Sequence, residues 1–160
     1  MNGVSRITVT EDISLITITN QTSDSVLIGN IFTEFAHEGI VIDMISQTVP
    51  QGSTMDISFT THSQHVVKVL EVISRIKDKY RQIKIMVSTG NCKIQLYGEE
   101  MREMNGVAAR AISALTQQNI DITMITTSEI DISIIVSPAN GLSAITALET
   151  SFDVSATVQG

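Results

Sequence analysis

The fold is decided by a stretch that occurs twice, as IFTEFAHEGIVIDMISQT at residues 31–48 and as AISALTQQNIDITMITTS at residues 111–128. Four apolar residues recur 80 positions later, in the pairs Ile40 and Ile120, Ile42 and Ile122, Met44 and Met124, Ile45 and Ile125. The triplet at 56–58, Asp-Ile-Ser, returns after only 75 positions at 131–133, so the loop before it is five residues shorter in the second copy. A repeat of this length exceeds the units of solenoid proteins. The sequence therefore predicts two similar small domains with a seam between them.

The first copy predicts the order strand, helix, strand, strand, helix, strand. Polar and apolar residues alternate in the strands, and apolar residues recur every three or four positions in the helices. The ranges are 13–19, 25–38, 41–49, 55–61, 63–79 and 83–88, and an opening strand at 4–10 precedes them across a turn at Asp12. We expect Ser23 or Asp24 to cap the first helix and Gly39 to end it. The predicted buried faces are Val26, Ile28, Ile31, Phe32 and Phe35 in the first helix, and Val66, Val69, Leu70, Ile73 and Ile76 in the second.

The second copy repeats this order after a predicted turn at Gly90-Asn91. Its elements are a strand at 93–97, a loop at 98–105, a helix at 106–118, strands at 120–127 and 130–136, and a helix at 139–150. The tail at 152–158 is a weak strand candidate, so the opening strand is expected to fill the last place in this sheet. The predicted domains are 11–90 and 91–160, the latter completed by residues 3–10. This is an α+β fold of two ferredoxin-like βαββαβ units, with antiparallel sheets, helices on one face, and the first unit inserted into the second.

Composition excludes several classes of function. The formal charge of −7 opposes binding to nucleic acids and to anionic membranes. Four Phe, two Tyr and no Trp leave few surfaces on which bases can stack. No apolar run approaches the ~20 residues of a membrane span, and residues 1–20 do not resemble a signal peptide. We therefore expect a cytoplasmic protein without nucleic-acid or membrane partners. The single cysteine, Cys92, fits a reducing compartment and is expected to be a strand residue without chemistry.

The sequence contains little that predicts catalysis. It has no phosphate-binding glycine pattern, no nucleophile elbow and no set of cysteine, histidine and acid. His62 and His65 could share a metal, but further ligands are not evident, so neither a metal nor a cofactor is expected. Asp43, Asp56 and Asp131 lie on or near strands, and nothing in their spacing requires them to act as pairs.

The loops at 20–25 and 98–105 are stronger candidates for a binding site. Each leads from a strand into a helix, and the first turn of a helix exposes unpaired N–H groups that can hold a carboxylate. Gly106 would admit a ligand close to the backbone, whereas the first copy has the bulkier Val26 at that point. A free amino acid would suit such a site. The alternative interpretation is that both loops are ordinary helix caps.

Several segments resemble the tandem ACT domains of aspartate kinases. The run 101–110, MREMNGVAAR, followed by 124–130, MITTSEI, is similar to the second ACT domain of that family. The runs 43–47, DMISQ, and 52–59, GSTMDISF, are similar to the first. The resemblance covers almost the whole chain, and the segments follow in the same order. The family's catalytic domain, which binds ATP and aspartate, has no counterpart in this sequence. The resemblance implies a regulatory portion that is not an enzyme by itself.

The resemblance also implies an allosteric site for lysine or threonine at an interface between ACT domains. Carried over to this sequence, the effector-binding positions of the first copy are Ser23, Asp24, Val26, Ile28, Asp43 and Gln47. Those of the second copy are Asn105, Gly106, Val107, Ala108, Asp121, Ile122, Met124, Ser128 and Glu129. The implied partners are a second copy of the chain, joined through edge strands as a homodimer, and an aspartate kinase catalytic subunit.

The first loop departs from the family pattern. Related kinases usually have Asp-x-Pro-Gly there, whereas this chain has Ser-Asp-Ser-Val at 23–26. In the second loop, Asn105 replaces a common proline and Glu100 a common glycine. Two hypotheses follow. Either the effector contacts have shifted, or the chain is an ACT-domain dimerisation scaffold that has lost the usual effector site.

Overall fold

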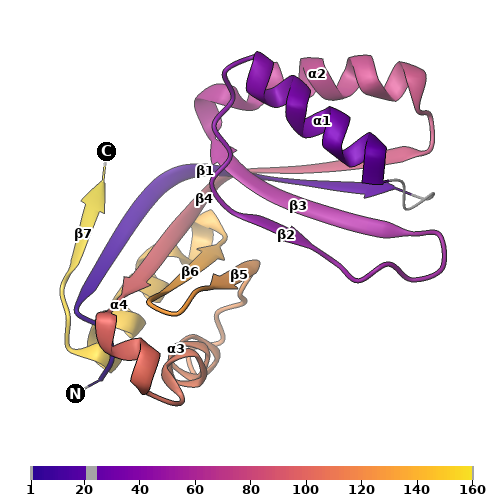
Figure 1. Ribbon diagram of the computed structural model, residues 1–160. Helices are drawn as coiled ribbons and strands as arrows, with labels where there is room; N and C mark the ends of the chain where they lie inside the picture. Colours follow the sequence, from indigo (N-terminus) through magenta and orange to yellow (C-terminus); the bar gives the residue numbers. More distant parts are fainter. Residues whose placement is uncertain (1, 21–24, 160) are drawn as a thin grey trace. The chain divides into compact units, whose positions relative to one another are not determined.

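The computed structural model describes residues 2–20 and 25–159 (Figure 1). The strands are β1 (Arg6–Asn20), β2 (Ile45–Gln47), β3 (Met55–His62), β4 (Ile83–Tyr97), β5 (Met124–Thr127), β6 (Asp131–Val136) and β7 (Ala156–Gln159). The α-helices are α1 (Ser25–His37), α2 (Val66–Lys79), α3 (Val107–Thr116) and α4 (Gly141–Phe152). Short 3-10 helices are η1 (Ser63–His65), η2 (Glu99–Glu103) and η3 (Pro138–Asn140). The chain divides into two compact units, which we call the inserted unit (Ile13–Thr89) and the split unit (Met1–Asp12 with Gly90–Gly160).

The inserted unit has the ferredoxin-like strand order β2-β3-β1-β4. Strands β1 and β3 are antiparallel, with Ile13 opposite His62 and Asn20 opposite Met55. Helices α1 and α2 cover one face of the sheet (Figure 1). The core between them consists mainly of Ile16, Ile18, Leu27, Ile31, Phe35, Ile57, Phe59, Val69, Val72, Ile73 and Ile83.

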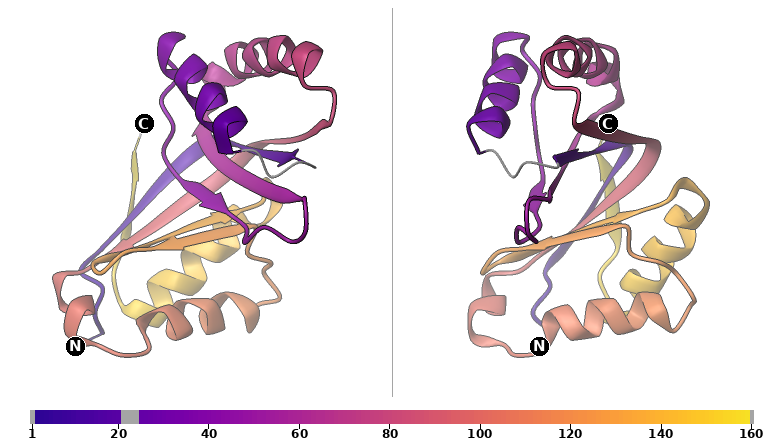
Figure 2. Two further views of the ribbon diagram at one scale, coloured as in Figure 1. Left: turned by 45° about the vertical axis from the view of Figure 1, so that its right-hand side comes forward. Right: turned by 90° about the vertical axis from the view of Figure 1, so that its right-hand side faces the viewer.

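The split unit has the strand order β5-β6-β4-β1-β7. Strands β4 and β6 are antiparallel, and β7 runs parallel to the first half of β1. The first half of β1 therefore lies beside β4, and β7 lies on the other side of β1, at the edge of the sheet. Both views of Figure 2 show α3 and α4 on one side of these strands. Ile7, Ile94, Leu96, Ala111, Leu148 and Phe152 are among the fully buried residues of this core. The predicted α+β class, with ferredoxin-like sheets and one unit inserted into the other, is confirmed.

Two predicted turns are wrong. Asp12 and Gly90 lie inside continuous strands, β1 and β4, and both have positive φ, 59° and 71°. A single residue of this kind shifts the alternation of side chains without reversing the strand, as a β-bulge does. In β1 the core residues are at positions 7 and 9 before Asp12 and at 16 and 18 after it, so the alternation changes from odd to even. This change of alternation predicts two strands, whereas the structure has one continuous strand.

Two helical positions predicted to be buried are exposed. Val26 is 69% exposed and Leu70 is 42% exposed, whereas Leu27 and Val72 lie in the core. In α1, burial follows the row Leu27, Ile31 and Phe35, whose members lie four positions apart on one side of the helix. Val26 precedes that row by one residue and therefore points about 100° away from it. The predicted strand at 41–49 is also shorter, because the regular ladder with β3 covers only β2 (Ile45–Gln47), with further backbone hydrogen bonds to β3 on either side of it.

Cys92 lies in β4 and is 7% exposed. Burial raises the pKa of its thiol, and the carboxylate of Glu11 raises it further. Because the thiolate is the reactive form, a raised pKa lowers its fraction at any pH below that value. We expect Cys92 to react with Ellman's reagent near pH 8 roughly tenfold or more slowly than free cysteine. Denaturant should restore the rate, and a fast reaction of the folded chain would contradict this burial.

Candidate functional site

The first turn of α3 presents backbone amides that have no partner within the helix. Gly106 precedes the helix with φ of 87°, a left-handed conformation that glycine adopts without strain. Its carbonyl oxygen accepts the first helical bond, from the N–H of Arg110 at 2.9 Å. No side chain of the described residues caps this helix end. The amides of Val107 and Ala108 are therefore available to an anionic group.

These amides border a pocket of about 580 Å³. Six of the residues that the sequence nominated line it, namely Asn105, Gly106, Val107, Ala108, Ser128 and Glu129. The other lining residues are Met101, Arg102, Met104, Thr127 and Ile132. The pocket thus joins the loop before α3 to the segment between β5 and β6. Both segments belong to the runs that resemble the second ACT domain, but only the tertiary structure shows which side chains of those runs face the pocket.

The charged rim of the pocket consists of Arg102 and Glu129. The guanidinium of Arg102 lies 3.9 Å from the carboxylate of Glu99 and 3.9 Å from that of Glu129. The Glu129 side chain is 82% exposed, so this ion pair contributes little to stability. The Glu129 carboxylate can therefore exchange its contact with Arg102 for a contact with a bound ammonium group.

The segment beside Glu129 is fixed by Ser128 and Asp131. The hydroxyl of Ser128 donates to Asp131 and accepts the N–H of Ile130 at 3.2 Å. The other carboxylate oxygen of Asp131 accepts a hydrogen bond of 2.8 Å from the side-chain amide of Gln95 on β4. The polar rim is thus held to the sheet, while Met101, Met104 and Ile132 supply an apolar wall.

The remaining nominated residues of the second copy lie outside the lining of this pocket. Asp121 is exposed, Ile122 is half-buried against the core of the split unit, and Met124 is buried at the start of β5. Ile122 packs against this core together with Ile120 and Ile125. Arg102 was missed, although it lies in a loop that sequence reasoning had singled out.

The nominated residues of the first copy are dispersed over several elements. Ser23 and Asp24 lie outside the described residues. Val26 is exposed in the first turn of α1, and Ile28 is half-buried on the same helix. Asp43 is exposed, and its N–H donates to the carbonyl of Thr60 at 3.0 Å. Gln47 is exposed on β2.

Tyr97 connects the end of β4 to the loop before α3. Its hydroxyl donates to the Glu99 carboxylate at 2.5 Å, and this hydrogen bond is the main cause of its raised pKa. The guanidinium of Arg6 lies 4.4 Å from the ring centroid of Tyr97. This exposed cluster gives the first residues of the loop a defined position next to the pocket.

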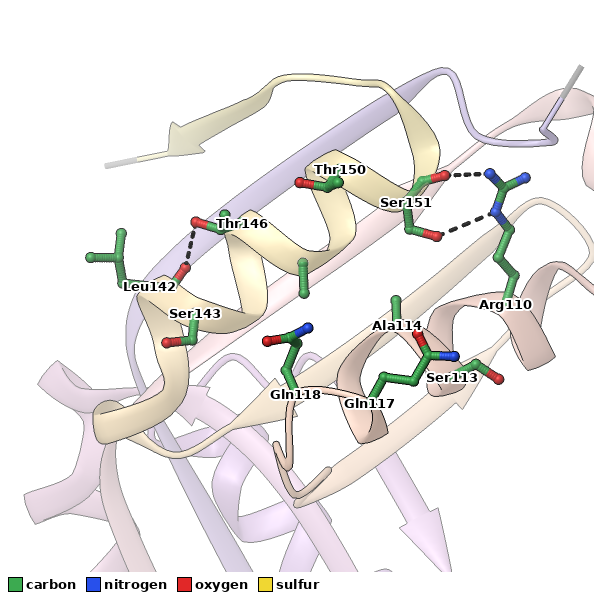
Figure 3. A pocket seen from close by; sticks show the side chains of 11 residues that line it. Arg110, Ser113, Ala114, Gln117, Gln118, Leu142, Ser143, Thr146, Thr150 and Ser151 are labelled. Carbon is green, nitrogen blue, oxygen red and sulfur yellow. Dashed lines mark hydrogen bonds between the residues drawn. The ribbon is translucent and has the colours of Figure 1, made fainter.

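A larger groove of about 690 Å³ lies between α3 and α4 (Figure 3). Its lining is mostly small or uncharged, and the guanidinium of Arg110 already donates to the hydroxyl of Ser151 at 3.3 Å and to its carbonyl. It offers no acidic group for an ammonium. The pocket at the start of α3 therefore suits a zwitterion better. Within the described residues, no three His, Cys, Asp or Glu side chains cluster as metal ligands, and no helix has the length and apolarity to cross a membrane.

Comparison with known proteins gives consistent matches. The family model of the ACT domain matches residues 94–152. Aspartokinase 2 of Bacillus subtilis is 32% identical over 145 residues, which are 91% of this chain and 35% of the relative. The chain thus spans about a third of the length of the curated relatives it matches.

Several solved structures match almost the full length of both chains. The regulatory subunit of aspartate kinase from Thermus thermophilus, in a ligand-free form, superposes with a TM-score of 0.85 at 24% identity. A chain from the structure of aspartokinase alpha and beta subunits superposes with a TM-score of 0.86 at 28% identity. In both cases the match covers 94% of this chain and 99% of the other.

Proposed function

We propose that this chain, which belongs with the ACT-domain regulatory regions of aspartate kinases, senses a free amino acid. Lysine or threonine is the effector that the family resemblance favours, in feedback control of aspartate-family amino-acid biosynthesis. The observation that carries the proposal is the uncapped start of α3, which opens into a pocket that also contains the exposed carboxylate of Glu129.

The two ends of an amino acid have complementary partners in this pocket. The amides of Val107 and Ala108 would hold its carboxylate, helped by the positive end of the helix dipole. Glu129 would accept its ammonium group, which displaces the long contact with Arg102. The apolar wall would contact the alkyl part of the effector side chain. The cytoplasm is the compartment in which such an effector and a kinase would meet.

The proposed assembly is a homodimer in which an ACT domain of a second copy closes the open rim, together with an aspartate kinase catalytic subunit. An effector held between two domains stabilises one arrangement of them. A coupling free energy of about 1–3 kcal/mol would change the activity of the partner several-fold to a hundredfold. Such an effector needs no contact with the catalytic site.

A panel of the twenty amino acids in a thermal-shift experiment tests the proposal. We expect lysine or threonine at millimolar concentration to raise Tm, because a ligand that binds only the folded state stabilises it. Glu129→Gln should weaken that binding roughly fivefold, since it removes a charge from an exposed contact.

Glu103→Gln is the matched control, because Glu103 lies in the same loop but does not line the pocket. The control should bind like the wild type. A flat response to all twenty amino acids would instead favour the dimerisation scaffold. The exposed Val26 at the start of α1, in place of the family's glycine, is the observation behind that second function.

A further inference from the structure

Gly3 fits against the wall of the pocket without room for a side chain. Its φ is 80°, and a Cβ added to it would lie 2.8 Å from Cγ2 of Val107 and 3.4 Å from Sδ of Met104. Val107 is a short, buried side chain and cannot swing away as a long one would. Val107 and Met104 also line the pocket. These two side chains are therefore packed between Gly3 and the pocket interior.

Contacts on both sides hold the segment Asn2–Ser5 in this position. The amide of Ser5 donates to the carbonyl of Tyr97 at 2.8 Å, at the end of β4. The side chain of Asn2 accepts the N–H of Val4 at 3.0 Å and donates to the carbonyl of Phe152 at the end of α4. The segment cannot move away from α3 without breaking these bonds, so a change at Gly3 must be transmitted toward Met104 and Val107.

We infer that Gly3 is a positioning residue for the amino-acid pocket, and that the segment Asn2–Ser5 responds to the occupancy of the pocket. This inference rests on the proposed function. A ligand on the amides of α3 presses on Val107 and Met104 from one side, and Gly3 supports them from the other. Coupling between binding and order is reciprocal, so a ligand that fixes Val107 also restricts the opening of Asn2–Ser5.

Gly3→Ala tests the positioning role, and Gly39→Ala is its control. Both glycines have positive φ, 80° and 71°, so both variants carry the same kind of backbone strain. A Cβ at Gly39 would meet nothing within 4 Å in the described structure. We expect Gly3→Ala to raise the Kd of the effector found in the panel by roughly tenfold, and Gly39→Ala to leave the Kd within twofold of the wild type.

A double variant separates contact from general destabilisation. Val107→Ala removes the atom that a Cβ at position 3 would meet. The double variant Gly3→Ala with Val107→Ala should therefore bind the effector more tightly than the sum of the two single changes in binding free energy predicts. Equal Kd values for Gly3→Ala and the wild type would overturn the positioning role. Simple additivity in the double variant would overturn the contact as its cause.

Hydrogen exchange measured by NMR tests the response of Asn2–Ser5 in the unaltered chain. At saturating effector, the amides of Val4 and Ser5 should exchange at least threefold more slowly, because their hydrogen bonds open less often. Unchanged exchange with a bound effector would refute this inference and leave the proposed function intact. Failure of every amino acid to bind the wild-type chain would refute the proposed function itself, and this inference with it.

Discussion

Replacing Gly98 by alanine is expected to destabilise the split unit by about 3 kcal/mol or more. The φ of Gly98 is −172°, an extended value open to any residue, so the reason is space and not backbone strain. An added Cβ would lie 1.7 Å from the carbonyl oxygen of Gly3 and 3.1 Å from Cα of Val4. Both obstacles are backbone atoms, so the segment before β1 would have to separate from the residue that follows β4. Urea denaturation would measure the loss.

Gly29→Ala is the matched control for Gly98→Ala. Gly29 lies within α1, and an added Cβ would meet nothing within 4 Å in the described structure. Because glycine in a helix costs roughly 0.5–1 kcal/mol relative to alanine, this variant should be more stable than the wild type. The same substitution of glycine by alanine is thus expected to lower stability at position 98 and to raise it at position 29. A stable Gly98→Ala protein would show that the close approach of Gly3 to Gly98 is wrong.

Phe59→Ala is expected to destabilise the inserted unit by about 3–5 kcal/mol. Phe59 is fully buried on β3, where its ring centroid lies 5.2 Å from that of Phe35 and 5.4 Å from that of Phe32. Truncation removes these ring contacts and leaves a cavity that the sheet cannot fill, because β3 is paired with both β1 and β2. Chemical denaturation followed by circular dichroism would measure the effect.

Phe32→Ala provides the comparison within the same aromatic cluster. Phe32 is only half-buried, at the edge of the core, and water can replace part of its packing. We expect roughly half the loss found for Phe59→Ala. Equal losses at the two positions would contradict the burial that the structure assigns to them.

The candidate site could be predicted in part. The loop before α3 could be predicted because helix starts hold anions. Both this loop and the segment at 128–129 could also be predicted from the family resemblance. Asp121, Ile122 and Met124 were nominated by the family resemblance alone, and they lie outside the pocket lining. Arg102 and the wall of Met101 and Met104 depend on how η2 folds across the helix start, which no periodicity in the sequence encodes.

The duplicated apolar pattern by itself determined the element order, the fold class and most core positions, because alternation and helical spacing are local consequences of backbone geometry. The sequence also contained the shift of alternation at Asp12 and Gly90, but a β-bulge and a turn leave the same pattern in a sequence. Only the tertiary structure decided that β1 and β4 continue through these points. It also decided that Gly3 meets Gly98 and Val107, because contact between residues so distant in the chain arises from packing of the whole unit and leaves no local signal.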